Sequence, residues 1–116
     1  MRNFRNMLIW KNGLNLVNKI YRLSKSLPDR ETYGLISQIT RSAVSIPSNI
    51  AEGCGRKSTK EFTRFLEISL GSAYELETQL LVIEQNFQIH KDELQIIIKD
   101  VIELQKMISK YIHSIN

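Results

Sequence analysis

Cysteines, long apolar runs and leader-like segments are all scarce in this sequence. Its one cysteine, Cys54, excludes an internal disulfide and is typical of a protein from a reducing compartment. No apolar run approaches the roughly 18 residues that a bilayer span needs. The apolar stretch near the N-terminus is also too short for a signal peptide. We therefore expect a cytoplasmic protein without a membrane partner.

Turn-forming residues are equally sparse. Only two prolines and five glycines occur among the 116 residues, which indicates long elements joined by few connections. Apolar residues make up 42% and charged residues 24%, values close to those of globular proteins, so the composition argues against disorder. A chain of this length suits one core, and we expect residues 1–116 to form a single domain.

Groups for metal binding or catalysis are few. His90 and His113 have no familiar zinc-ligand spacing with each other or with Cys54. The segment GCGRKS (53–58) contains glycines and a lysine, but not at the spacing of a phosphate-binding loop. Cys54 lies beside basic residues that can lower a thiol pKa, although we interpret it as a small, semi-buried side chain. We expect no catalytic residue, no metal and no cofactor, and hence not an enzyme.

The charge is distributed unevenly along the chain. Residues 1–57 carry ten Lys and Arg against three Asp and Glu, net +7, whereas residues 58–116 carry six against nine, net −3. Surfaces of opposite sign could meet within the fold or between copies, or a basic face could bind an anion. An uneven but merely solvated surface is the alternative.

Apolar residues recur at helical spacing in four separate blocks. The first block has two rows side by side, and each of the others has one row with alternating steps of three and four. The rows are Trp10, Leu14, Val17 and Tyr21 with Leu16, Ile20, Leu23 and Leu27; Ile36, Ile39, Ala43, Ile46 and Ile50; Phe62, Leu66, Ser69, Ala73, Leu76, Leu80, Ile83 and Phe87; and Leu94, Ile97, Val101, Leu104, Ile108, Tyr111 and Ile115. This repeat favours helices whose axes cross at a small angle. Short connections make sequential helices run in opposite directions. The sequence predicts an all-α, up-down-up-down antiparallel four-helix bundle.

Local signals predict where these helices begin and end. Leu27-Pro28 ends the first helix, and Asp29 is expected to cap the second. Glycines at 53 and 55 predict a left-handed C-cap for the second helix, and Ser58 to Glu61 match a capping box for the third. Small residues at 71–73 predict a close approach to a neighbouring helix.

The segment SIPSNIAEG (45–53) places a proline inside the second helix. Pro47 deletes a backbone hydrogen bond and costs about 3 kcal/mol in a helix interior, so a break with a new cap is one possible outcome. Ile46 and Ile50 nevertheless stay in phase with the preceding apolar row. We therefore predict a continuous helix over 31–53 that is kinked at Pro47.

Polar rows run beside the apolar rows of the second and third helices. The second helix contributes Gln38, Arg41, Ser45, Asn49 and Glu52, and the third contributes Ser72, Glu75 and Gln79 with Glu77 a little to the side. Amides and hydroxyls are unusual on a purely solvated face. We predict that these residues form a network that fixes the register between helices or between subunits, with Arg41 binding a carboxylate. A loosely solvated polar face is the alternative.

At this point the sequence resembles a known family. The segments QITRSAVSIPSNIAEG (38–53) and EFTRFLEISLGSAYELETQL (61–80), with YGLISQ (33–38), Trp10 and Tyr21, are similar to the four-helix bundle proteins encoded by intervening sequences in some bacterial 23S ribosomal RNA genes. Thr40 and Glu67 depart from the family pattern, where a second arginine and a basic or neutral residue are usual. The resemblance implies a ring-shaped homopentamer with no established enzymatic activity. The family is also similar in fold to accessory proteins of diversity-generating retroelements, which bind nucleic acid through basic surfaces.

Two functions fit these observations. In the first, the oligomer binds RNA or DNA without catalysis, and the candidate contacts around the turn after the second helix are Arg56, Lys57, Lys60 and Arg64. In the second, the protein is a self-assembling scaffold that docks a protein partner and binds no nucleic acid. Both remain open on the sequence.

Overall fold

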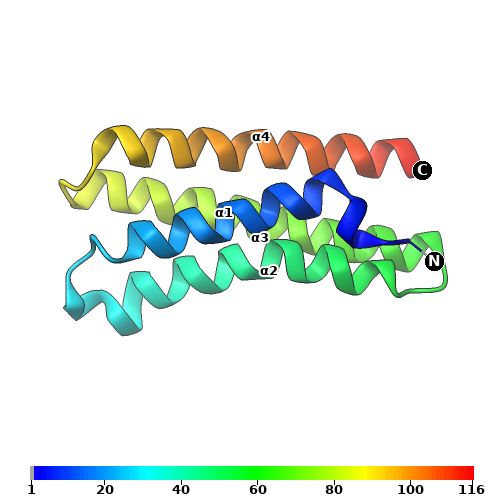
Figure 1. Ribbon diagram of the computed structural model, residues 1–116, viewed down its shortest axis with the longest axis horizontal. Coiled ribbons are helices and arrows are strands. Elements are labelled where there is room, and N and C mark those ends of the chain that lie inside the picture. The colour runs from blue at the N-terminus through cyan, green and yellow to red at the C-terminus, as the bar shows by residue number, and fades with distance from the viewer. Residues whose placement is uncertain (1) are drawn as a thin grey trace.

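Four long antiparallel helices account for most of the chain in a computed structural model that describes residues 2–116 (Figure 1). The helices are α1 (Leu8–Ser24), α2 (Ser37–Cys54), α3 (Thr59–Asn86) and α4 (Lys91–Ile115). Three short helical turns complete the described elements: η1 (Phe4–Asn6), η2 (Asp29–Glu31) and the π-helical turn η3 (Thr32–Ile36). The predicted all-α, up-down-up-down four-helix bundle is confirmed.

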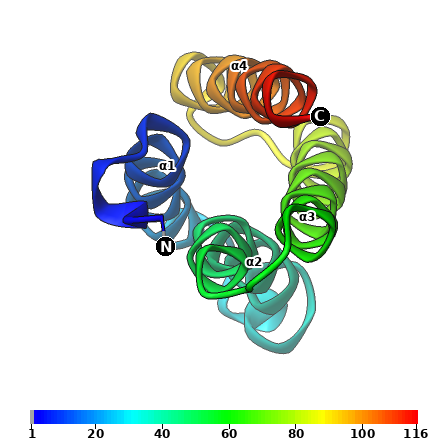
Figure 2. The ribbon, with the colours of Figure 1, turned by 90° about the vertical axis from the view of Figure 1, so that its right-hand side faces the viewer.

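Viewed end-on, the helices surround a single core in the order α1, α2, α3, α4 (Figure 2). The apolar rows predicted for α2, α3 and α4 form most of this core, and the side chains of Ile39, Leu66 and Val101 are completely or almost completely buried. The bundle measures 44 × 23 × 20 Å, as expected for helices of this length packed side by side.

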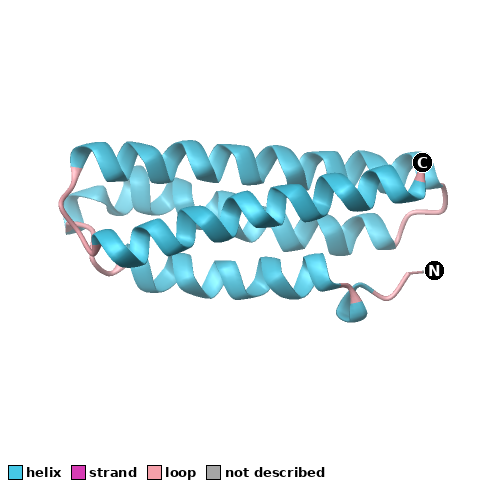
Figure 3. Cartoon of the chain, turned by 90° about the horizontal axis from the view of Figure 1, so that it is seen from above, coloured by secondary structure: helices cyan, strands magenta, loops and turns pink. Residues whose placement is uncertain are grey.

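Both termini and the α2–α3 turn lie at one end of the bundle, and the other two connections lie at the opposite end (Figure 3). We call residues 2–16, 46–72 and 104–116 the terminal half, and residues 17–45 and 73–103 the loop half. Hydrogen bonds from Ser69 to Ile46 and from Gln105 to Ala73 mark the level at which the halves meet.

In α1, the buried face follows the second predicted row and only part of the first. Leu16, Ile20 and Leu23 are buried, but Leu14 is 42% exposed and Tyr21 is 51% exposed. The first row lies at the edge of the buried face, so Val17 and Trp10 reach the core while Leu14 and Tyr21 point further round the helix towards solvent. The expectation that Leu14 and Tyr21 form a core row was wrong.

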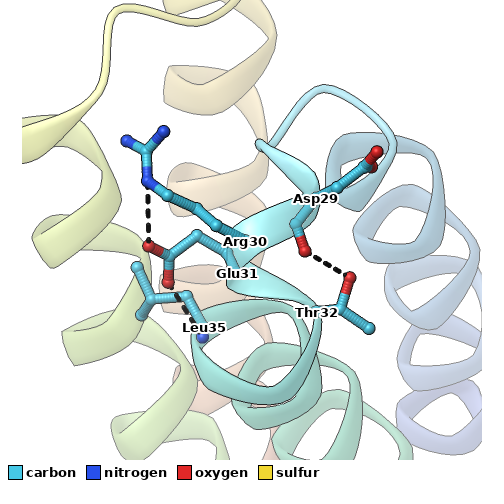
Figure 4. Close-up of polar contacts among 5 residues, drawn as sticks. All are labelled: Asp29, Arg30, Glu31, Thr32 and Leu35. Atoms are coloured by element: carbon cyan, nitrogen blue, oxygen red, sulfur yellow. Dashed lines mark hydrogen bonds and ion pairs between the residues drawn. The ribbon is translucent and has the colours of Figure 1, made fainter.

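The segment before α2 is irregular, whereas one helix was predicted from residue 31. Pro28, not Asp29, occupies the cap position, and the Thr32 hydroxyl donates a hydrogen bond of 2.6 Å to the Asp29 carbonyl (Figure 4). The Glu31 carboxylate accepts from the backbone N–H of Leu35 and so caps the next turn. Gly34 then departs from helical geometry, with φ −104° and ψ −110°, and regular α2 begins only at Ser37.

Helix α2 continues through Pro47, as predicted. Pro47 is buried against α1, where a Cβ on Gly13 would lie 3.4 Å from the proline Cβ. Helix α1 therefore passes close to the proline ring at Gly13. A kink at Pro47 itself stays a prediction, since the non-helical dihedral angles in this segment lie at Gly34.

The α2–α3 turn is closely packed. Gly55 has φ −84°, so the predicted left-handed cap was wrong. Gly53 instead permits contact between helices, because a Cβ there would lie 2.7 Å from the Cβ of Phe65. Ser58 accepts a hydrogen bond from the Glu61 N–H at 3.1 Å, which confirms the serine half of the capping box.

Candidate nucleic-acid interface and polar groove

The two halves of the bundle differ strongly in charge. The terminal half contains nine Lys and Arg against three Glu, net +6, and the loop half contains seven Lys and Arg against nine Asp and Glu, net −2. The asymmetry along the chain is therefore an asymmetry along the bundle axis. Such a segregated positive end attracts anions over several ångströms of solvent.

The predicted basic residues all lie at this end. Lys57, Lys60 and Arg64 are exposed, and no ion pair joins them to an acidic group within residues 2–116. Arg56 differs from them, because its guanidinium pairs with Glu52 at 2.9 Å and lies 4.5 Å from the centroid of the Phe65 ring. Three of the four candidates thus form no ion pair with a described residue, whereas Arg56 is held by Glu52 and Phe65.

Helix α3 adds to this surface through its N-terminus. Lys57 precedes the Ser58 cap, and Lys60 lies in the first turn, where several backbone N–H groups have no partner within the helix. The partial positive charge of a helix N-terminus favours phosphate. Glu61 in the same turn partly opposes this effect.

Part of the predicted polar network joins α2 to α3. The hydroxyls of Ser45 and Ser72 are 2.8 Å apart, and the Asn49 amide donates to both the hydroxyl and the carbonyl of Ser45 at 2.8 Å. Deeper in the core, the Ser69 hydroxyl donates to the Ile46 carbonyl at 2.8 Å. These bonds fix the register of the two helices at the level of Pro47, and the assembly role of the row stays a prediction.

Other members of the network do not take the expected roles. Arg41 and Glu75 are exposed and form no ion pair with any described residue, so the expected Arg41–carboxylate contact is absent within one chain. Glu52 binds Arg56 instead of the polar row, and Glu77 turns towards α4, where it accepts from Gln105 at 2.8 Å. A long charged side chain on a helix edge can reach several neighbours, and helical spacing cannot choose among them.

The remaining polar residues line a groove between α2 and α3. Its walls are Gln38, Arg41, Ser42, Ser45, Glu75 and Gln79. Gln79 is only 9% exposed, and its carbonyl oxygen accepts no hydrogen bond from the described residues. A buried amide oxygen without a donor costs free energy, so the groove is the least satisfied polar site described in the fold.

A second groove, between α3 and α4, was not predicted from the sequence. Tyr74 stands on one side, and Lys106, Lys110 and His113 stand on the other. The three α4 residues step by four and three, so their spacing could have indicated a common basic face. That Tyr74 lies opposite them could not be read from spacing within one helix.

Cys54 is buried, and its thiol contacts the sulfur of Met7 at 3.5 Å. Burial raises the pKa of the Cys54 thiol, and the nearby charge of Arg2 opposes this only partly. The thiol is therefore protonated near neutral pH, as expected for a structural cysteine.

Within residues 2–116, no cluster of three or more potential metal ligands occurs. None of the described helices is both long and apolar enough to span a bilayer.

Comparison with known proteins places this bundle in a family. The family model described as 23S rRNA-intervening sequence protein matches residues 5–110. The crystal structure of a protein of unknown function, from the S23 ribosomal protein family of Bacteroides thetaiotaomicron, is similar with a TM-score of 0.83. The two sequences are 27% identical, and the match covers 90% of this chain and 98% of that chain. No curated protein matches the sequence. The chain belongs to the 23S rRNA-intervening sequence protein family.

Proposed function

We propose that this protein binds nucleic acid without catalysis, through phosphate contacts at the terminal half of the bundle. The observation that carries the proposal is the net charge of +6 at that half against −2 at the other. Lys57, Lys60 and Arg64 supply exposed, unpaired cations beside the N-terminus of α3. Such contacts bind the backbone of RNA or DNA and carry no base sequence information.

The salt dependence of affinity tests this proposal. Fluorescence anisotropy would follow a labelled duplex at several salt concentrations, with the wild type and with a K57A/K60A/R64A variant. Removing three phosphate contacts should make the slope of log K against log salt less steep by about 2.7. A matched variant, K25A/R30A/K91A, removes three exposed cations from the loop half and should leave the slope nearly unchanged.

Two results would contradict the proposal. One is a wild type that does not bind at low salt, and the other is an equal loss of slope in both triple variants. The first result would leave the scaffold that docks a protein partner as the better interpretation.

We further propose that the protein acts as a homo-oligomer, and the family resemblance leads us to expect five subunits. Support comes from apolar side chains left exposed where α1 meets α2. On α1, Leu14 follows Gly13, which faces Pro47, and is 42% exposed. On α2, Val44 lies one turn before Pro47 and is 40% exposed. Burying such side chains between subunits is favourable.

Native mass spectrometry tests this second part. An L14E/V44E variant should shift the protein from a pentamer to monomers, because burying two carboxylates in a contact is costly. Ile96→Glu, which changes an exposed residue on α4, is the control and should stay assembled. A monomeric wild type would contradict the proposal.

A further inference from the structure

We propose that the groove between α3 and α4 binds a single-stranded segment of nucleic acid, with one base stacked on Tyr74 and phosphates bound by Lys106 and Lys110. This inference rests on the proposed function and names the form of nucleic acid that one surface prefers. It concerns a surface distinct from the turn that carries Lys57, Lys60 and Arg64.

The groove has the shape and lining that a single strand needs. It is an open hollow of about 460 Å³ whose rim carries Tyr74, Lys106, Lys110 and His113. Lys106 and Lys110 lie one turn apart on α4, separated by about 6 Å along the helix axis, and so could bind neighbouring phosphates. His113 continues the same face, and its ring is held near the Ser109 carbonyl at 3.2 Å.

Tyr74 is available as a stacking platform. The residue lies at the start of the loop half, beside the boundary with the terminal half, and is 52% exposed. An aromatic ring beside a row of cations is the usual arrangement for binding unpaired bases, since every base offers a flat face whatever its identity. In a duplex the bases already stack on one another, so the ring has no base to bind.

The groove floor is fixed by hydrogen bonds between the two helices. Gln105 donates to the Ala73 carbonyl at 3.3 Å and to the Glu77 carboxylate at 2.8 Å. The Glu77 carboxylate is bound by this neutral amide, and it forms no ion pair with Lys106 or Lys110 within residues 2–116. Among residues 2–116, Lys106 forms one ion pair, a long and exposed contact of 3.8 Å with Glu103, and such a pair is weak in water.

The position of the groove connects it with the basic end. The Asn116 amide donates to the Thr63 hydroxyl at 3.1 Å, so the last turn of α4 lies beside the first turns of α3. A strand in the groove that runs towards this end would reach the surface of Lys57 and Lys60. One strand could thus use both sets of cations.

The test compares a labelled oligothymidine of about 15 nucleotides, within the usual site size of single-strand binding modules, with a duplex of the same length. Tyr74→Ala should weaken binding of the single strand about tenfold and leave duplex binding within twofold. Tyr74→Phe should retain single-strand affinity, because stacking needs the ring and not the hydroxyl. Tyr33→Ala is the matched control, since Tyr33 is 97% exposed and does not line this groove.

A second variant, K106Q/K110Q, should reduce the salt dependence of single-strand binding without loss of helical content by circular dichroism. Equal single-strand affinities for wild type and Tyr74→Ala would overturn the inference, even where the K57A/K60A/R64A variant has lost binding. An equal loss for single strand and duplex in Tyr74→Ala would also overturn it. A wild type that binds neither form would overturn the proposed function as well.

Discussion

The terminal and loop halves of this bundle share one core but differ in their surfaces. Buried residues such as Ile50 and Leu66 in one half, and Ile39 and Leu80 in the other, belong to the same apolar cluster. The net charges of the halves are nevertheless +6 and −2. Because both halves contribute to the same apolar core, the core does not account for the difference in charge. The difference is the basis of our proposal that the terminal half binds nucleic acid.

The halves also differ in how their helices are joined. In the terminal half, glycines allow close packing, with Gly13 facing Pro47 and Gly53 facing Phe65. In the loop half, α2 is preceded by an irregular turn at Gly34, and α4 is preceded by His90 with a positive φ of 23°. We infer that the terminal half is the more rigid platform, which suits a surface that must hold several cations in place.

The largest effect on stability is expected at Gly53. A Gly53→Ala substitution would place a methyl group 2.7 Å from the Cβ of Phe65, so α2 and α3 must separate. We expect the free energy of unfolding to fall by about 1–3 kcal/mol, measured by urea denaturation.

Gly71→Ala is the matched control, because a Cβ there has open space around it. Alanine favours the helix over glycine, so this variant should be more stable by about 0.5–1 kcal/mol. Equal effects of the two substitutions would contradict the close packing that we assign to the terminal half.

These two glycines also show what the sequence could and could not predict. Four helices and three of the core rows followed from apolar periodicity, because burial repeats with the helix turn. The roles of the glycines did not follow. Within the predicted close approach at 71–73, Ser72 meets Ser45 of α2, but Gly71 has open space around it, and the tightest glycine contact lies at Gly53. Contacts between helices depend on their relative rotation, which periodicity within one helix leaves undetermined.

The candidate site was predictable to a similar extent. The exposed cluster of Lys57, Lys60 and Arg64 could be predicted because residues three and four apart lie on the same face of a helix. The pairing of Arg56 with Glu52 is also local, but it was overlooked in favour of a polar row between helices. Tyr74 and Lys110 lie on different helices, α3 and α4, and line the same groove. Spacing within one helix does not reveal such a pair.

A smaller effect is expected for the ion pair between Lys19 and Asp100, which joins α1 to α4 in the loop half. Both side chains are 37% exposed, so water and salt screen their attraction. Lys19→Ala should lower the free energy of unfolding by about 0.2–1 kcal/mol at low salt, and less at high salt. Lys99→Ala, an exposed lysine on α4, is the control. A loss as large as that of Gly53→Ala would contradict the contrast between the halves.

The smallest effect concerns pH and Cys54. Burial raises the pKa of this thiol in the folded protein above its ordinary value of 9.0. The thiol of the unfolded chain then loses its proton first as pH rises, so this contribution to stability is present below pH 9.0 and is lost above it. Urea denaturation across this range should show a decline that Cys54→Ala removes. A decline of the same size in Cys54→Ala would assign it to other groups.

The most direct test of the account compares two variants with the same net charge. K57E/K60E reverses two charges in the terminal half, K25E/K91E reverses two in the loop half, and each lowers the formal net charge from +4 to 0. Nucleic-acid affinity would be measured by anisotropy at one fixed low salt concentration. We predict that K57E/K60E loses more than about tenfold in affinity and that K25E/K91E stays close to the wild type. Equal losses in the two variants would show that only the total charge matters, and would contradict an interface at the terminal half.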